Sequence, residues 1–495
     1  MKSEIKNAMQ KISSLYIAFM IIYLFVLPSE GYSNIVESKF KFYRIITSAY
    51  IISEVFLTIL FIYKNTRIKY CKYITDIDVF MFAYLIFTLI SFIISEYPKN
   101  IWGNGRFDGF GTIALYVLSF FFLSKYCIYK KWMLLMYSCS IVLFCCIGFI
   151  QLIGKNPFSL YPYNLNYWDA GILYSGKYWS FVGNTNLCGA LLSLSIGIFA
   201  TAFLIKGKVY YAIPFCISVF SIFKIEAEAS IVSLILGLLL CTIIWVNSLN
   251  RLRNMLCILG FTFLSLAISF CITFLDGFIE ITLNKNVVLF FIVSGLFSVM
   301  YIFIEKINLK NYEKSLRYFF LWISVAVTIF TIMFIYYYGD FHNKTIIELQ
   351  NILHGNFNDI YGSNRFYIWR NVISIIKEKP LFGGGPDTLI YRGIAGFSRY
   401  SKEVDKVIYG SIDAAHNEYL NICVNQGVFA LIAYMAAIFC TLKKCTRVNT
   451  DENKIIAGGG VLFYLIQAFF GISMCLTTPF LWIILSLING NLKEE

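Results

Sequence analysis

Long apolar segments recur from one end of this chain to the other. The runs Val79–Ser95 and Phe319–Tyr338 are almost free of charge, and a helix of about 20 apolar residues crosses a hydrocarbon core about 30 Å thick. Hydrophobic residues make up 59% of the 495 residues and charged residues only 14%, against about 25% charged residues in soluble domains. The chain is therefore predicted to be an all-α, polytopic integral membrane protein.

The apolar runs divide the chain into three parts. Residues 1–338 contain about eleven predicted membrane helices, residues 339–415 form the longest polar segment, and residues 416–495 contain about three more helices. The total is about fourteen, within a range of about 12–14, because the last two runs are joined tightly enough to form one re-entrant pair. The predicted spans are residues 13–28, 45–63, 77–95, 112–125, 133–154, 186–205, 208–224, 228–246, 254–275, 287–304, 318–338, 416–441, 455–475 and 476–490.

Lysine and arginine residues are concentrated in alternate connections between the runs. Cytoplasmic loops carry such an excess, so both termini are expected in the cytoplasm. The same pattern accounts for the net charge of +13 without nucleic-acid binding. It places three polar segments on the outer face, residues 96–111, 155–185 and 339–415. The first run, Leu15–Leu27, is not followed by a small-residue cleavage site, so we expect it to remain as a helix.

The outer loop 339–415 is predicted to contain an interfacial helix. Ser363 is a candidate N-cap for a helix over residues 364–377, and Pro380 is expected to end it. One apolar stripe follows from the spacing of Phe366, Trp369, Ile373 and Ile376. Arg365 has two interpretations: an interfacial arginine that extends toward the headgroups, or a bidentate clamp for a phosphate.

Two further features of the outer face carry candidate chemistry. The segment Pro380–Asp387 contains Gly383 and Gly385, and it predicts either a sharp turn or a nest of N–H groups that binds an anion. His416 opens the predicted span 416–441, whose next turns carry Asn421, Asn425 and Gln426. Polar groups within a membrane helix usually face the bundle interior and mark function, and a histidine can take a proton at neutral pH.

Two earlier patches are predicted on the same face. Residues 103–111 contain Arg106 among glycines, and residues 181–186 contain Asn184 and Asn186 at the mouth of the sixth helix. Each alone is typical of a glycine-rich loop. Together they would add an arginine and two amides to the face that carries His416.

These residues resemble the bacterial O-antigen ligase and O-antigen polymerase superfamily. The resemblance covers most of the chain and is strongest from Tyr361 to Ala430. It is carried by an ordered set of motifs: Gly105-Arg106-Phe107-Asp108-Gly109, Gly183-Asn184-Thr185-Asn186, Asn364-Arg365 through Trp369, Lys379-Pro380-Leu381-Phe382-Gly383 and His416-Asn417-Glu418-Tyr419. No single motif is diagnostic, and the order of the set is what is specific.

The resemblance implies a multi-pass glycosyltransferase of the cytoplasmic (inner) membrane that uses a polyprenyl-diphosphate-linked glycan as donor. Arg365 would match the essential loop arginine and His416 the essential histidine. The candidate substrate-binding residues are Arg106, Asn184, Asn186, Trp369, Arg370, Gly383, Gly385, Asn417 and Tyr419. One departure is that Glu226-Ala227-Glu228 stands where the family often has a Ser-Arg pair, so Arg106 or Arg370 would have to compensate.

The expected reaction inverts the anomeric centre and uses neither a metal nor a cofactor. Cations would stabilise the departing diphosphate, and His416 would remove the proton of an acceptor hydroxyl. The acceptor stays open among a lipid core, a growing glycan and a protein. The alternatives are a transporter or flippase of lipid-linked oligosaccharides, which should carry charges along a mid-membrane path, and a membrane sensor or assembly protein.

Overall fold

The structure is a computed structural model of the chain. It describes residues 2–27, 31–64, 74–161, 174–275, 278–306, 313–339, 341, 343–392, 397–401, 406–410, 412–447 and 450–490. All statements about the structure below refer to these residues. The architecture is all-helical, with two small antiparallel hairpins added to the bundle.

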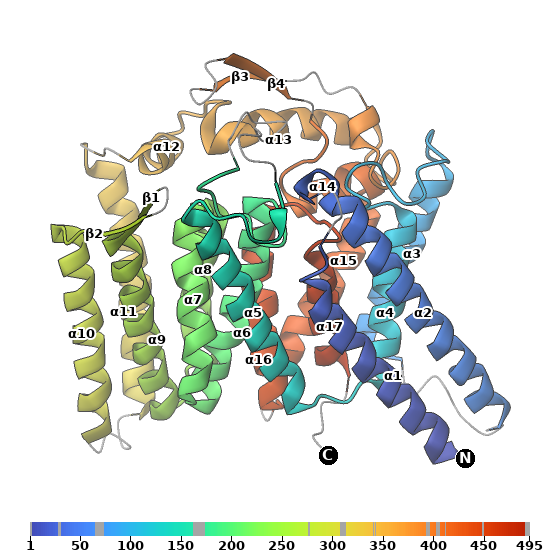
Figure 1. The fold of residues 1–495 in the computed structure, drawn as a ribbon, viewed down its shortest axis with the longest axis horizontal. Helices are drawn as coiled ribbons and strands as arrows, with labels where there is room; N and C mark the ends of the chain where they lie inside the picture. Colours follow the sequence, from blue (N-terminus) through green and yellow to red (C-terminus); the bar gives the residue numbers. More distant parts are fainter. Residues whose placement is uncertain are drawn as a thin grey trace.

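The helices of the N-terminal two thirds form an elongated bundle (Figure 1). They are α1 (Lys2–Tyr23), α2 (Ile35–Tyr63), α3 (Asp76–Ile93), α4 (Phe110–Tyr126), α5 (Lys131–Leu152), α6 (Thr185–Lys206), α7 (Ala212–Ile225), α8 (Glu228–Trp245), α9 (Leu249–Cys271), α10 (Lys285–Lys306) and α11 (Glu313–Tyr337). The hairpin β1 (Ile272–Leu275) and β2 (Phe278–Ile281) joins α9 to α10 and pairs Ile272 with Ile281.

The last third of the chain first forms an outer layer and then returns to the bundle. The outer layer contains α12 (Lys344–Leu353), α13 (Tyr361–Glu378), β3 (Phe397–Ser401) and β4 (Lys406–Gly410). The returning helices are α14 (Glu418–Gln426), α15 (Val428–Cys445), α16 (Glu452–Ala468) and α17 (Thr478–Asn489). In Figure 1 the outer layer covers the end of the bundle opposite to the one at which both termini lie.

Every predicted span overlaps a helix, although fewer helices meet a strict criterion for crossing a membrane. Eight helices among the described residues are long and apolar enough, and four shorter apolar helices accompany them. The chain is thus a multi-pass membrane protein. The number of fourteen spans, the predicted division at residues 338 and 415, and the orientation of the termini remain predictions.

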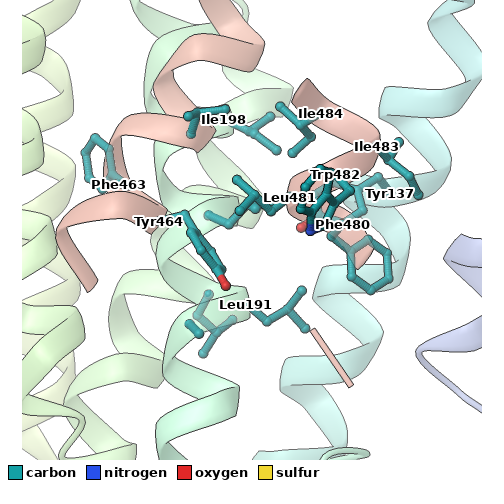
Figure 2. Packing of buried hydrophobic residues seen from close by; sticks show 14 of the residues in the cluster. Tyr137, Leu191, Ile198, Phe463, Tyr464, Phe480, Leu481, Trp482, Ile483 and Ile484 are labelled. Atoms are coloured by element: carbon teal, nitrogen blue, oxygen red, sulfur yellow. The ribbon is translucent and has the colours of Figure 1, made fainter. Parts of the chain in front are cut away.

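The core is built around α6, which lies almost entirely inside the bundle. α6 packs against α16 through small residues: a Cβ at Gly197 would collide with the carbonyl of Gly459, and a Cβ at Gly459 with Thr201. Small residues let membrane helices approach closely and pack by van der Waals contact. Figure 2 shows Leu191 and Ile198 of α6 among side chains from α16 and α17.

The prediction of one continuous helix over 416–441 was wrong. α14 ends at Gln426 and α15 begins at Val428, with Gly427 between them at φ 88° and ψ 172°. The carbonyls of Pro380 and Leu381 accept the N–H groups of Val428 and Phe429, at 2.9 and 3.4 Å. A side chain at residue 427 would collide with Leu381. Glycine at this position therefore allows the segment that contains Pro380 and Leu381 to pack between α14 and α15.

The predicted helix over residues 364–377 is present within α13, but one detail of the prediction was wrong. Ser363 does not cap it, because Gly362, Ser363 and Asn364 form a left-handed first turn inside the assigned helix. The most buried positions are Ile368 and Val372, which pack on Leu389, Ile412 and Val424, whereas Ile373 of the predicted stripe is exposed. α13 therefore packs on protein through a face displaced from the predicted stripe. The prediction that Pro380 ends the helix fits its end at Glu378.

Candidate functional site

His416 lies at the start of α14 in a left-handed backbone conformation, φ 48°. Its neighbours are held on both sides. Asn417 caps α14 by accepting the N–H of Leu420 at 3.0 Å, and the carbonyl of Ala415 accepts the indole N–H of Trp369 at 3.0 Å. A left-handed conformation at a non-glycine residue costs free energy and persists where the surroundings impose it, commonly at functional sites.

Arg106 and Asp413 form a bidentate ion pair next to His416. Arg106 Nε donates to Asp413 Oδ2 at 3.0 Å, and Arg106 Nη2 donates to Asp413 Oδ1 at 2.7 Å. The pair joins the loop before α4 to the segment before α14. Such fork-to-fork pairs fix geometry as well as charge.

Asp387 holds the loop that carries Arg106. Its side chain accepts the backbone N–H groups of Asn104 at 3.0 Å and Asp108 at 3.3 Å. Asn100 in turn donates to the carbonyls of Pro386 and Asp387, at 3.1 and 2.9 Å. The loop 100–108 is therefore fixed by the segment after the glycine-rich turn, and this fixes where the guanidinium of Arg106 lies.

Arg365 enters the site from the left-handed first turn of α13. Its Nη1 donates to the carbonyl of Gly362 at 3.2 Å, and its buried Nε has no hydrogen-bond partner among the described residues. Burial lowers the pKa of Arg365, and Glu228 at the start of α8 raises it in part. Glu228 also accepts the hydroxyl of Thr345 in α12 at 2.8 Å. Arg365 thus has unused donor capacity beside a carboxylate.

Electrostatics tie these groups into one site. The pKa of His416 falls to about 4 because of its burial, then the charges of Arg106 and Arg365, while Asp413 opposes the shift. Burial acts to raise the pKa of Asp413, but the charge and hydrogen bonds of Arg106 outweigh it and hold that pKa below its ordinary value. His416 is therefore neutral at pH 7, the form that can accept a proton, and two cations lie within reach of its charge.

The backbone N–H groups of the glycine-rich turn form hydrogen bonds within the protein. The N–H of Gly383 donates to the carbonyl of Lys379, and those of Gly384 and Gly385 donate to the carbonyls of Val424 and Asn425 at the end of α14. A Cβ at Gly383 would collide with Asn425 and one at Gly385 with Ser95. These contacts fit the sharp-turn interpretation, in which Gly383 and Gly385 seat the outer segment on α14.

The other predicted binding residues lie in different settings. Asn184 caps α6 by accepting the N–H of Leu187 at 3.1 Å, and Asn186 is half-buried in the first turn. That end of α6 contacts the start of α8, because a Cβ at Gly189 would collide with Ser230. Tyr419 donates its hydroxyl to the carbonyl of Leu465 at 2.7 Å.

Arg370 does not point into the same centre. It is exposed and forms an ion pair with Asp359. Trp369, apart from its bond to Ala415, packs its ring on Phe469 and Phe470. Of the two arginines that were predicted to compensate, Arg106 is the one whose charge, with that of Arg365, lowers the pKa of His416.

Sequence reasoning gave no role to three carboxyl groups that shape the site. Asp413 pairs with Arg106, Asp387 holds the loop, and Asp108 is buried beneath it. Asp413 precedes His416 by three residues and Asp108 follows Arg106 by two, so proximity to the candidate residues was the available signal. The described residues contain no group of three or more His, Cys, Asp or Glu side chains arranged to hold a metal ion.

A family model described as O-antigen ligase matches residues 281–435. This match supports membership of the O-antigen ligase family. The matched segment runs from the end of β2 into α15 and includes Arg365, Asp413 and His416, whereas Arg106 and Asn184 lie outside it. Membership supports a role in glycan transfer of the ligase or polymerase type. No curated protein matches the chain.

Proposed function

We propose that this protein transfers a glycan from a polyprenyl-diphosphate donor to an acceptor hydroxyl at the outer face of the cytoplasmic membrane. The observation that carries the proposal is that two contacts bring the segments of three residues together. The Arg106–Asp413 ion pair and the hydrogen bond from Trp369 to Ala415 join the loop of Arg106 and the helix of Arg365 to the segment of His416, and the charges of both arginines lower the pKa of His416. The family match covers two of these three residues. The third comes from a loop far away in the sequence, which supports a site assembled by the fold.

The donor diphosphate would bind at Arg365. The buried Nε and the remaining guanidinium N–H groups can donate to phosphate oxygens, because only Nη1 has a hydrogen-bond partner among the described residues. As the glycosidic bond to the diphosphate breaks, the electron pair moves to the diphosphate oxygen. Fixed cations in a poorly hydrated site stabilise this growing charge.

His416 would act as the general base. The acceptor O–H bond breaks, its oxygen attacks the anomeric carbon opposite the diphosphate, and the proton moves to the imidazole, so the reaction inverts the anomeric centre. A base in this position contributes about 10²–10⁴ to the rate. The anionic diphosphate would offset the cations that lower the pKa of His416, so donor binding should strengthen the base.

The proposal is tested with purified protein in detergent, a polyprenyl-diphosphate glycan and a mixture of lipid, glycan and protein acceptors, with EDTA present. Transfer that persists in EDTA supports the metal-independent transferase, and the labelled product names the acceptor. His354 is the control histidine, because it lies at the C-terminal end of α12 in the outer layer and stacks on Tyr336. No transfer to any acceptor in detergent, together with donor movement across the membrane when the same protein is placed in proteoliposomes, would favour a flippase.

A further inference from the structure

A seam of buried hydroxyl groups runs along the contacts between α1, α2 and α4. On α2, Tyr43, Thr47, Tyr50 and Glu54 follow one another at intervals of four, three and four residues, so they share one face. All four are buried, and Glu54 is fully buried. At 1.5 Å per residue the face extends about 16 Å along the helix. We call these four residues with Ser13, Tyr16, Tyr116 and Ser119 the hydroxyl seam.

Hydrogen bonds connect the part of the seam that lies nearer to the end of the bundle with the two termini. Ser13 donates to Glu54 Oε1 at 3.0 Å and shares a hydrogen bond of 3.0 Å with the hydroxyl of Tyr50. Tyr50 stacks on Tyr16, with ring centroids 4.3 Å apart. One turn toward the inner face, Thr58 and Tyr126 share a hydrogen bond of 3.1 Å at the end of α4. The seam thus begins close to the end of the bundle at which the termini lie.

The upper part leads toward the functional site. The hydroxyls of Tyr16 and Thr47 share a hydrogen bond of 3.1 Å. Tyr43 lies one turn before Thr47 on the same face of α2, and Ser119 donates to the carbonyl of Tyr116 at 3.0 Å. The ring of Tyr43 lies 5.5 Å from that of Tyr116, centroid to centroid. Tyr116 lines a cavity of about 20 Å³, together with Tyr84, Asp108, Glu418 and Gln426.

Two residues that line this cavity, Asp108 and Glu418, are close in sequence to residues of the site. Asp108 follows Arg106 by two residues and Glu418 follows His416 by two, so both carboxyl groups belong to the segments that carry the cation and the base. Glu418 accepts the hydroxyls of Tyr434 and Tyr464, both at 3.0 Å. A space of this size with several polar partners can hold a water molecule.

Hydroxyl groups also hold membrane helices together without any further role. Groups that serve only that purpose should be hydrogen-bonded, yet three atoms of the seam have no partner among the described residues: Tyr43 Oη, Tyr116 Oη and Glu54 Oε2. An unsatisfied buried polar group destabilises the folded state. A carboxyl group inside a membrane bundle usually marks a functional path, often one for protons.

We propose that the hydroxyl seam is a proton path between the cavity that Tyr116 lines and the inner side of the membrane. The inference rests on the proposed function, which releases one proton per transfer. His416 takes that proton from the acceptor and passes it to a water molecule in the cavity. The hydroxyls of Tyr116, Tyr43, Thr47, Tyr16, Tyr50 and Ser13 then relay a proton to Glu54, which releases one inward. One proton enters and one leaves, so the seam itself is unchanged after each cycle.

The test uses proteoliposomes with the donor in the membrane, a water-soluble acceptor added outside and a pH-sensitive dye inside. The acceptor reaches only those protein molecules whose outer face points to the outside of the liposome. In these molecules the cytoplasmic face points into the lumen. The wild-type protein should acidify the lumen by about one proton per glycan transferred. Glu54→Gln keeps the hydrogen bond from Ser13 but cannot carry a proton in the same way, so transfer should continue without acidification of the lumen.

Two further variants complete the design. Tyr116→Phe removes a hydroxyl that bonds to no described residue, so it should fold normally and also abolish acidification of the lumen. Glu37→Gln, on the same helix in an exposed pair with Lys41, should behave like the wild type. Transfer without acidification in the wild type, or equal acidification in Glu54→Gln, would overturn the path alone. Absence of transfer in the wild type would overturn the proposed function and the path with it.

Discussion

Two polar clusters lie at opposite ends of the bundle, and they differ in how many of their hydrogen-bonding groups have partners. The inner cluster surrounds Asp78 of α3, which accepts hydrogen bonds from the backbone and hydroxyl of Thr75, from Asn489 and from Lys125. Lys444 adds a bond to the carbonyl of Asn489 at 2.8 Å. These contacts connect α3, α4, α15 and α17 through one fully buried carboxylate.

The outer cluster around His416 contains a hydrogen-bond donor without a partner among the described residues, and several of its residues have a strained backbone conformation. Arg365 Nε has no partner among the described residues, and Phe107, Ser363, Asn364, Asp387 and His416 all have positive φ. Such strain persists only where the surroundings over-determine it, and it gathers at ligand sites. The difference indicates that the inner cluster stabilises the bundle, whereas the outer cluster is prepared for a ligand.

After the loss of His416 itself, the replacement of Arg365 should have the largest effect on transfer. Arg365→Ala removes a cation aimed at the diphosphate, and the loss of one such donor costs about 10²–10³ in rate. Arg365→Lys, which keeps the charge but not the fork, should retain a measurable fraction. Lys377→Ala, in the last turn of the same helix, is the matched control and should leave the initial rate unchanged. A normal rate in Arg365→Ala would remove this residue from the mechanism.

Asp413→Asn should have the next largest effect. The change breaks the bidentate pair with Arg106 and removes the carboxylate that opposes the low pKa of His416. Loss of a partner that orients a functional group costs about 10–100-fold. Initial rates at saturating donor would measure it. If the rate stayed the same while donor affinity rose, Asp413 would be a competitor of the diphosphate for Arg106 instead of a support for His416.

The pH dependence should shift in Arg106→Gln. His416 works in its neutral form, so activity should be present above its pKa of about 4 in the free protein and be lost as the pH falls through that value. Removing the positive charge of Arg106 should raise the pKa of His416 and move this acid limb of kcat/KM to higher pH. The same limb in variant and wild type would contradict the electrostatic coupling of the two residues.

Asp78→Asn should have the smallest effect on transfer and a clear effect on stability. It leaves Lys125 without its carboxylate in a largely buried position, which costs about 3 kcal/mol or more. Thermal unfolding in detergent should show a lower melting temperature, while the transfer rate per folded molecule stays normal. Asp76→Asn, exposed on the same turn, should change neither. A loss of transfer with a normal melting temperature would contradict the assignment of a purely stabilising role to the inner cluster.

The helices could be predicted from the sequence because the apolar runs have the length of a membrane span and because the lipid leaves the backbone few alternatives to a helix. The break at Gly427 could not be predicted in the same way. It depends on the carbonyls of Pro380 and Leu381, which come from a separate segment and accept the freed N–H groups. Ser363 failed as a cap because the turn from Gly362 to Asn364 is left-handed, a geometry that places the Arg365 side chain.

The candidate site was predicted as a set of residue types and assembled only by the fold. His416 and Arg365 lie in segments that the sequence marks by composition, and the structure brings them within reach of each other's charge. The pair Arg106–Asp413 joins residues 307 positions apart, so the spacing of residues in the sequence could not predict it. The hydroxyl seam shows the same limit, because its face on α2 is visible in the sequence but its partners on α1 and α4 are not.

The most direct measurement is a single-turnover transfer assay that compares the wild type with His416→Gln and His354→Gln. We expect a loss of about 10²–10⁴ in rate for His416→Gln with unchanged donor binding, and a normal rate for His354→Gln. A normal single-turnover rate in His416→Gln would contradict the central claim that this histidine takes the acceptor proton.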